Sequence, residues 1–216
     1  MSARFPRFFF LGLALAAAGL RAADPALPRP AEPRTIVFFG DSLTAGYGLD
    51  DPADEAYPAL IQKKISAAGL AWRVVNAGLS GETTSGGLRR VDWILRQPVD
   101  VFVLALGGND GLRGIEPAVS RANLQRIMDR VRAKNPATKI VLAGLQMPSN
   151  LGPDYTREFA AMYPALAGQN HATLIPFLLE GVGGDAALNQ RDGIHPTAEG
   201  HALVAETVWK ILRPLL

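Results

Sequence analysis

The chain has 216 residues, 48% of them hydrophobic, which is long enough for one sizeable core and too short for two comfortable domains. It contains no cysteine, which excludes disulfide bonds, cysteine-based zinc sites and thiol nucleophiles. Its 22 basic and 20 acidic residues give a formal net charge of +2, and no basic field argues for a nucleic acid partner.

The first 22 residues have the layout of a secretory signal peptide. Arg4 and Arg7 precede an apolar run over residues 8–20, and small residues follow it. A membrane anchor is the weaker alternative, because the run is shorter than the roughly 20 residues that a bilayer core requires. We therefore expect export to the periplasm or the medium, cleavage near Ala22 or Ala23, and no stable membrane anchor. Without residues 1–22 the chain keeps 19 basic and 20 acidic residues, a net charge of −1.

Residues 23–34 are rich in proline and alanine and predict a flexible lead-in to one domain over residues 35–216. Strand patterns occupy residues 35–39 and 72–76, then two continuous apolar runs at 99–108 and 138–147, and a weaker run at 171–178. Helical patterns lie between and after them, at residues 57–70, 87–97, 117–134, 155–167 and 196–212, the last with Pro196 in its first turn.

Strands that alternate with helices of about a dozen residues predict an α/β fold with right-handed crossovers and a parallel sheet covered by helices on both faces. In such sheets the functional groups collect at the carboxyl ends of the strands. We therefore take the residues that follow each strand as the candidate site.

Three strands are followed by small and polar residues, at positions 40–42, 76–81 and 107–110. Each segment alone has a structural explanation, since glycines such as Gly40 permit turns and Asn or Asp caps the next helix. A fourth segment, "RDGIHPTAEGH", favours a catalytic interpretation because Asp192 and His195 lie three residues apart just before the last helical pattern.

A serine hydroxyl needs a general base within hydrogen-bonding reach, and an imidazole base needs a carboxylate that fixes its tautomer. Ser42, His195 and Asp192 supply these three groups. The chain has two other histidines; we expect His171 at the surface and His201 on a different face of the last helix.

Hydrolysis through a tetrahedral intermediate also requires hydrogen-bond donors for the oxyanion. The backbone N–H groups of Ser42 and Gly81 and the side-chain amide of Asn109 are suited to that role. The chain has no G-x-S-x-G, G-x-G-x-x-G, P-loop or H-E-x-x-H motif, so other hydrolase, dinucleotide, phosphate and zinc chemistries find no support. We expect no metal and no cofactor.

The segments "GDSLTAGYG", "NAGLSGE", "GGND" and "DGIHP" resemble, in order, the conserved blocks of the SGNH hydrolases, also called the GDSL esterase/lipase family. The resemblance runs from about residue 35 to the C-terminus and is strongest to exported bacterial thioesterases and lysophospholipases. It implies a flavodoxin-like three-layer α/β/α sandwich with a parallel five-stranded sheet. It also implies the same roles for Ser42, Asp192, His195, Gly81 and Asn109.

The expected function is a serine esterase that hydrolyses small acyl esters or thioesters, lysophospholipids among them, through an acyl-enzyme. Leu112 and Met147 either line an acyl pocket or belong to the core. One alternative is a carbohydrate O-acetyl esterase, which the scarcity of candidate aromatic sugar platforms disfavours. Another is a non-catalytic lipid-binding envelope protein, which the presence of all three catalytic groups disfavours. We expect a monomer.

Overall fold

The computed structural model describes residues 33–216. The predicted signal peptide, and the predicted lead-in up to residue 32, lie outside the described residues. No helix of the described part is long and apolar enough to cross a membrane.

Five strands form one parallel sheet in the order β2-β1-β3-β4-β5. Their bounds are Arg34–Gly40 (β1), Trp72–Gly78 (β2), Val101–Ala105 (β3), Lys139–Ala143 (β4) and Thr173–Ile175 (β5). All residues of the central β3 are buried, as expected for a strand covered on both faces. The edge strand β5 is short and half-buried, which explains its weak sequence pattern. The predicted parallel α/β sheet is therefore confirmed.

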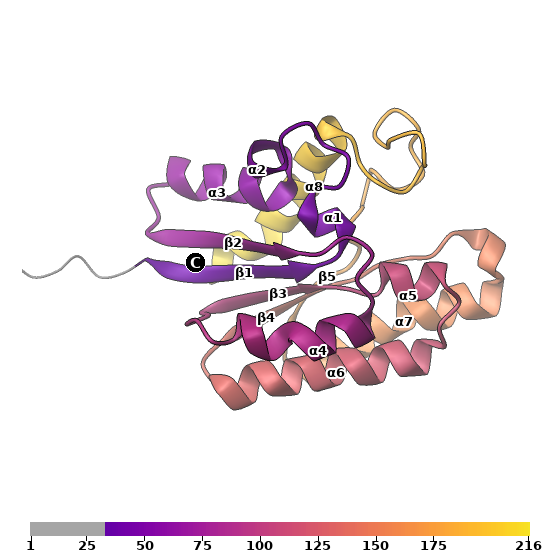
Figure 1. The fold of residues 1–216 in the computed structure, drawn as a ribbon, viewed down its shortest axis with the longest axis horizontal. Coiled ribbons are helices and arrows are strands. Elements are labelled where there is room, and N and C mark those ends of the chain that lie inside the picture. Colours follow the sequence, from indigo (N-terminus) through magenta and orange to yellow (C-terminus); the bar gives the residue numbers. More distant parts are fainter. Residues whose placement is uncertain (1–32) are drawn as a thin grey trace, which may run out of the picture. The chain divides into compact units, whose positions relative to one another are not determined.

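Helices cover both faces of this sheet, so the predicted three-layer sandwich is also confirmed (Figure 1). In Figure 1, α3 and the yellow α8 lie on one face, and α4, α6 and α7 lie on the other. The helices are α1 (Ser42–Ala45), α2 (Pro52–Glu55), α3 (Tyr57–Ala67), α4 (Thr84–Ile94), α5 (Gly108–Leu112), α6 (Pro117–Lys134), α7 (Pro153–Gln169) and α8 (Ala198–Leu212). Two short 3₁₀ turns, Ser149–Leu151 and Arg213–Leu215, complete the elements.

Three predicted helix starts differ from the structure. Helix α7 begins at Pro153, two residues before the predicted start, with that proline in its first turn. Side-chain caps explain the other two differences. Helix α4 begins at Thr84, earlier than residue 87, because the Thr83 hydroxyl accepts a hydrogen bond from the Gly86 N–H. Helix α8 begins at Ala198 because Thr197 caps it in the same way, through the Gly200 N–H. Pro196 therefore precedes the helix and pairs with Asn189 in an isolated β-bridge.

The order of the strands determines where a site can form. Strand β1 has β2 on one side and β3 on the other, so the direction of winding reverses at β1, and such a switch point leaves a crevice at the carboxyl edge. Gly40 pairs with Gly78 of β2 and with Ala105 of β3, so the three strands end at one level. The loops that carry the candidate residues therefore start side by side.

Candidate active site

Ser42 is the first residue of α1 and follows β1 after one intervening residue, Asp41. The Asp41 carboxylate caps α1 by accepting a hydrogen bond of 3.1 Å from the Leu43 N–H. Gly40 does not have a positive φ, contrary to the expectation that it permits a turn. It is needed instead for close packing, because a Cβ at Gly40 would lie 2.0 Å from the Thr44 hydroxyl and 2.8 Å from the Ala105 carbonyl oxygen.

Ser42, His195 and Asp192 form one chain of hydrogen bonds. The His195 Nε2 lies 2.8 Å from the Ser42 Oγ, and the His195 Nδ1 lies 2.7 Å from the Asp192 Oδ2. An ionised carboxylate only accepts hydrogen bonds, so Asp192 places the imidazole proton on Nδ1 and leaves Nε2 to accept the serine proton. The structure thus brings together the three residues that the sequence predicts as a catalytic set.

The loop that carries Asp192 also stabilises its negative charge. The Asp192 Oδ1 accepts hydrogen bonds from the N–H groups of Ile194 (3.0 Å) and His195 (3.1 Å). Partial burial pushes the pKa of Asp192 upward, but the hydrogen bonds from the His195 ring and from these N–H groups outweigh it and hold the pKa below its ordinary value. Asp192 is therefore ionised at neutral pH.

Neither of the other two histidines, His171 and His201, is hydrogen-bonded to Ser42. His201 is buried in the first turns of α8, where its Nδ1 accepts a hydrogen bond of 3.3 Å from the Tyr57 N–H. Burial lowers the pKa of His201 to about 4, so this ring is neutral. His171 is exposed, before β5.

Besides the Ser42 N–H, the predicted oxyanion donors are Gly81, in the loop after β2, and Asn109, in the short helix α5 after β3. Gly81 follows β2 and has a positive φ of 78°, which a residue with a Cβ adopts only with strain. Asn109 is the second residue of α5, and its side-chain amide donates a hydrogen bond of 3.0 Å to the carbonyl oxygen of Glu82. Arg113 donates to the Gly81 carbonyl oxygen from the other side, at 3.1 Å. Asn109 is thereby placed beside the Gly81 peptide.

Arg90 connects these loops, and sequence patterns alone do not reveal it. Its guanidinium donates to the carbonyl oxygens of Gly40 (3.2 Å) and Ala77 (2.8 Å) and forms an ion pair with Glu82. The same guanidinium lies 4.1 Å from the centre of the Phe39 ring. Arg90 therefore fastens the ends of β1 and β2 to the loop that carries Gly81. In the sequence it is one of two adjacent arginines in α4, and nothing there marks it.

Asp110 fixes the segment that carries Asn109 through buried hydrogen bonds. It is fully buried, and its carboxylate accepts hydrogen bonds from the Thr84 N–H (2.8 Å), the Thr84 hydroxyl (2.5 Å) and the Ser120 hydroxyl (3.1 Å). These donors belong to α4 and α6, so three helices meet at one carboxylate. Asp110 is a structural anchor rather than the helix cap that its place after a strand suggests.

The carboxyl of Asp41, next to Ser42, has a strongly raised pKa. Its carboxyl is buried and has no basic partner within ion-pair distance among residues 33–216. Burial raises the pKa of Asp41 from 3.8 to about 7, although the Leu43 N–H and the positive charge that His195 can carry act in the opposite direction. Asn109 Nδ2 lies 3.5 Å from the Asp41 Oδ2, the limit of a hydrogen bond.

An apolar cavity of about 460 Å³ opens beside Ser42 and His195. Leu112 and Met147 both line it, together with Leu145, Phe177, Leu179 and Ile194. Leu112 is 47% exposed, so it belongs to the cavity mouth and not to the core. Asn109 lines the same cavity, so an amide donor and apolar side chains share one cavity with Ser42.

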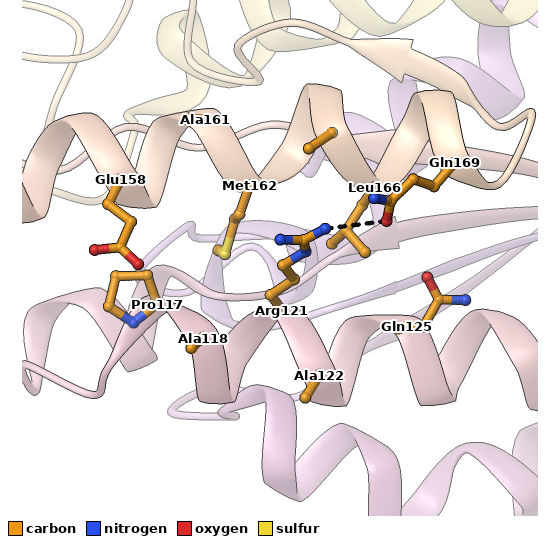
Figure 2. A pocket seen from close by; sticks show the side chains of 11 residues that line it. Pro117, Ala118, Arg121, Ala122, Gln125, Glu158, Ala161, Met162, Leu166 and Gln169 are labelled. Carbon is orange, nitrogen blue, oxygen red and sulfur yellow. Dashed lines mark hydrogen bonds between the residues drawn. The ribbon is translucent and has the colours of Figure 1, made fainter.

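A second cavity, of about 580 Å³, lies between α6 and α7 and contains none of the predicted site residues (Figure 2). Arg121 donates a hydrogen bond of 3.1 Å to Gln169 across it. Neither a histidine nor a serine lines it, in contrast to the cavity beside Ser42. Across residues 33–216, no group of three or more histidine, aspartate or glutamate side chains is arranged to hold a metal ion.

Comparison with known proteins agrees with this geometry. A family model described as the GDSL-like lipase/acylhydrolase family matches residues 38–203. Esterase TesA of Pseudomonas aeruginosa is 42% identical over 191 residues, 88% of this chain and 93% of that protein. Thioesterase 1/protease 1/lysophospholipase L1 of Escherichia coli K12 is 38% identical over 87% of this chain and 88% of that protein. A crystal structure of TesA has a TM-score of 0.80, with 42% identity, and covers 85% of this chain and 100% of its own. With its four sequence blocks, its fold and these relatives, the chain belongs to the GDSL-like lipase/acylhydrolase family of SGNH hydrolases.

Proposed function

We propose that the protein is a serine esterase that hydrolyses carboxylic esters or thioesters of acyl chains through an acyl-enzyme. The observation that carries this proposal is the hydrogen-bonded chain of Ser42, His195 and Asp192 at the wall of an apolar cavity. The names of the relatives support it, since they include an esterase and a thioesterase/lysophospholipase.

In the first half-reaction the Ser42 Oγ attacks the acyl carbonyl carbon while His195 Nε2 takes the hydroxyl proton. The oxyanion accepts hydrogen bonds from the backbone N–H groups of Ser42 and Gly81 and from the Asn109 amide. The C–O or C–S bond to the leaving group then breaks, and His195 returns the proton to that group. Asp192 stabilises the imidazolium that forms between these two proton transfers.

In the second half-reaction a water molecule attacks the acyl-enzyme carbonyl, and His195 accepts a proton from that water. The same donors hold the second oxyanion, and collapse of the intermediate releases the carboxylic acid and restores the Ser42 hydroxyl. The apolar lining contributed by Leu112 and Met147 would receive the acyl chain, since burying each methylene contributes about 0.8 kcal/mol. Lysophospholipids are one substrate class with such a chain.

The test is hydrolysis of p-nitrophenyl esters from acetyl to palmitoyl by the mature protein, with Ser42→Ala as the matched control. We expect activity that disappears in Ser42→Ala, together with covalent labelling of the unaltered protein by a fluorophosphonate. A fully active Ser42→Ala protein would refute the mechanism. An optimum at acetyl, with no activity on longer chains, would instead favour a deacetylase.

We also propose that residues 1–22 direct export and are removed, and that the mature protein is a monomer. The intact mass of the protein purified from cell fractions tests the first point, and light scattering tests the second. Recovery of the full-length chain from the cytoplasm alone would refute export.

A further inference from the structure

Two segments that are far apart in the sequence meet at the bond between Ser42 and His195. Residues 41–48 carry the serine at the end of β1, and residues 188–197 carry the histidine before α8. In the described part of the chain, one other direct hydrogen bond joins these segments. It runs from the Gln190 Nε2 to the Tyr47 carbonyl oxygen and is 2.7 Å long.

Gln190 is also fastened to the histidine side of the contact. Its Nε2 donates a second hydrogen bond, of 3.0 Å, to the Pro196 carbonyl oxygen, and its backbone N–H donates to the His195 carbonyl oxygen at 2.7 Å. A glutamine amide has two N–H donors, so both are used here. One side chain thus links Tyr47, two residues after the end of α1, with Pro196, the residue that follows His195.

The backbone of residues 47–48 leaves room for the side-chain amide of Gln190. Gly48 has a φ of 76°, and a Cβ there would lie 2.1 Å from the Gln190 Oε1. The Tyr47 side chain takes part as well, because its ring centre lies 4.7 Å from the imidazole centre at an interplanar angle of 47°. His195 is therefore held at its backbone by Gln190 and at its ring by Tyr47.

We propose, on the basis of the proposed function, that Gln190 is a positioning residue that keeps the His195 imidazole within reach of Ser42 throughout the catalytic cycle. The bond between His195 and Ser42 cannot do this itself, because it is lost once the serine oxygen is acylated. His195 must nevertheless remain in place to activate the water for deacylation. The bond from Gln190 to Tyr47 does not involve the reacting atoms, so it persists when the other is broken.

The test compares Gln190→Met with the unaltered protein and with Gln97→Met. Methionine has nearly the length of glutamine and no N–H donors, so the change removes the two side-chain bonds and little volume. Gln97 is exposed and lies before the amino end of β3, whereas the candidate site lies at the carboxyl ends of the strands, so Gln97→Met is a matched control. The measured quantities are kcat and KM for a p-nitrophenyl ester, and the rate and final stoichiometry of fluorophosphonate labelling.

We expect Gln190→Met to lower kcat by about tenfold with KM unchanged, since a displacement of about 1 Å in a catalytic group costs up to roughly 10²-fold. Labelling should slow by a similar factor and still reach one label per chain, which shows that the folded fraction is intact. Tyr47→Ala, which keeps the carbonyl oxygen, should cost less than Gln190→Met.

An unchanged kcat and labelling rate in Gln190→Met would overturn the proposal. So would a reduced final stoichiometry with an unchanged rate per labelled site, because that pattern reports lost folding and not lost positioning. If the unaltered protein is not labelled at all, the proposed function fails first.

Discussion

Replacing Asp41 by asparagine should stabilise the protein strongly at neutral pH and only slightly in acid. The Asp41 carboxyl is 2% exposed, and burial raises its pKa from 3.8 to about 7. Between these values the folded protein binds a proton that the unfolded chain has released. Stability therefore falls as the pH rises through this range, and the loss is complete above pH 7. Asparagine has the same shape and accepts the same hydrogen bond from Leu43, but it does not ionise.

The size of the effect follows from the same values. The interval from 3.8 to about 7, at about 1.4 kcal/mol for each pH unit, gives a cost of about 4 kcal/mol at high pH. At pH 4.5 the cost is only about 1 kcal/mol, so the gain from Asp41→Asn should grow by about 3 kcal/mol between pH 4.5 and pH 8.

Urea denaturation of both proteins at pH 4.5 and pH 8 measures this gain. At each pH the free energy of unfolding of the unaltered protein is subtracted from that of the variant, and the contributions of the other titrating groups cancel when the two results are compared. A gain in the free energy of unfolding that is the same at both pH values would refute the reasoning. An ionised Asp41 also favours the His195 imidazolium electrostatically, so we expect Asp41→Asn to lower kcat at pH 8 despite its higher stability.

Three further substitutions, one of them paired with a control at Gly168, test the site and its supports. Asn109→Ala should lower kcat by about 10²–10³-fold with little change in KM, because one oxyanion donor is lost; a loss below threefold in steady-state assays would argue against that role. Gly78→Ala places a Cβ 2.3 Å from the Ala45 backbone nitrogen, so it should displace α1, reduce activity and lower the free energy of unfolding by about 1–3 kcal/mol in thermal unfolding. Gly168→Ala, on α7, places its Cβ in open space and should instead raise the free energy of unfolding by about 0.5–1 kcal/mol. Met147→Trp should fill the cavity and reduce kcat/KM for long-chain p-nitrophenyl esters about tenfold relative to the acetyl ester, and an unchanged chain-length profile would place the acyl chain elsewhere.

The sheet was predictable because its signals are local. The runs that become β3 and β4 are continuously apolar, and both are buried on two faces in the structure. The polar residues after β1, β2 and β3 were predictable as one site for a different reason, since the strands of a parallel sheet bring the loops that follow them to one edge.

What the sequence does not reveal depends on partners far along the chain. Arg90 reaches the ends of β1 and β2, and Gln190 reaches Tyr47, 143 residues away. Neither residue type nor spacing predicts these hydrogen bonds, because donor and acceptor come within reach only after the helices have packed. The start of α8 was misplaced for a local reason. Pro196 fits the pattern of a first-turn proline, but the Thr197 hydroxyl caps the helix, so Ala198 is its first residue.

The position of His195 along the chain has a consequence for how the enzyme matures. Ser42 belongs to the first strand-to-helix connection, whereas its partner is 153 residues later, just before the final helix α8. In the proposed mechanism Ser42 meets its base only when α8 has docked against α3 and β5, so in a chain still being synthesised or only partly folded Ser42 lacks that partner. Reactivity of Ser42 toward a phosphonate should therefore appear only once the C-terminal helix is in place.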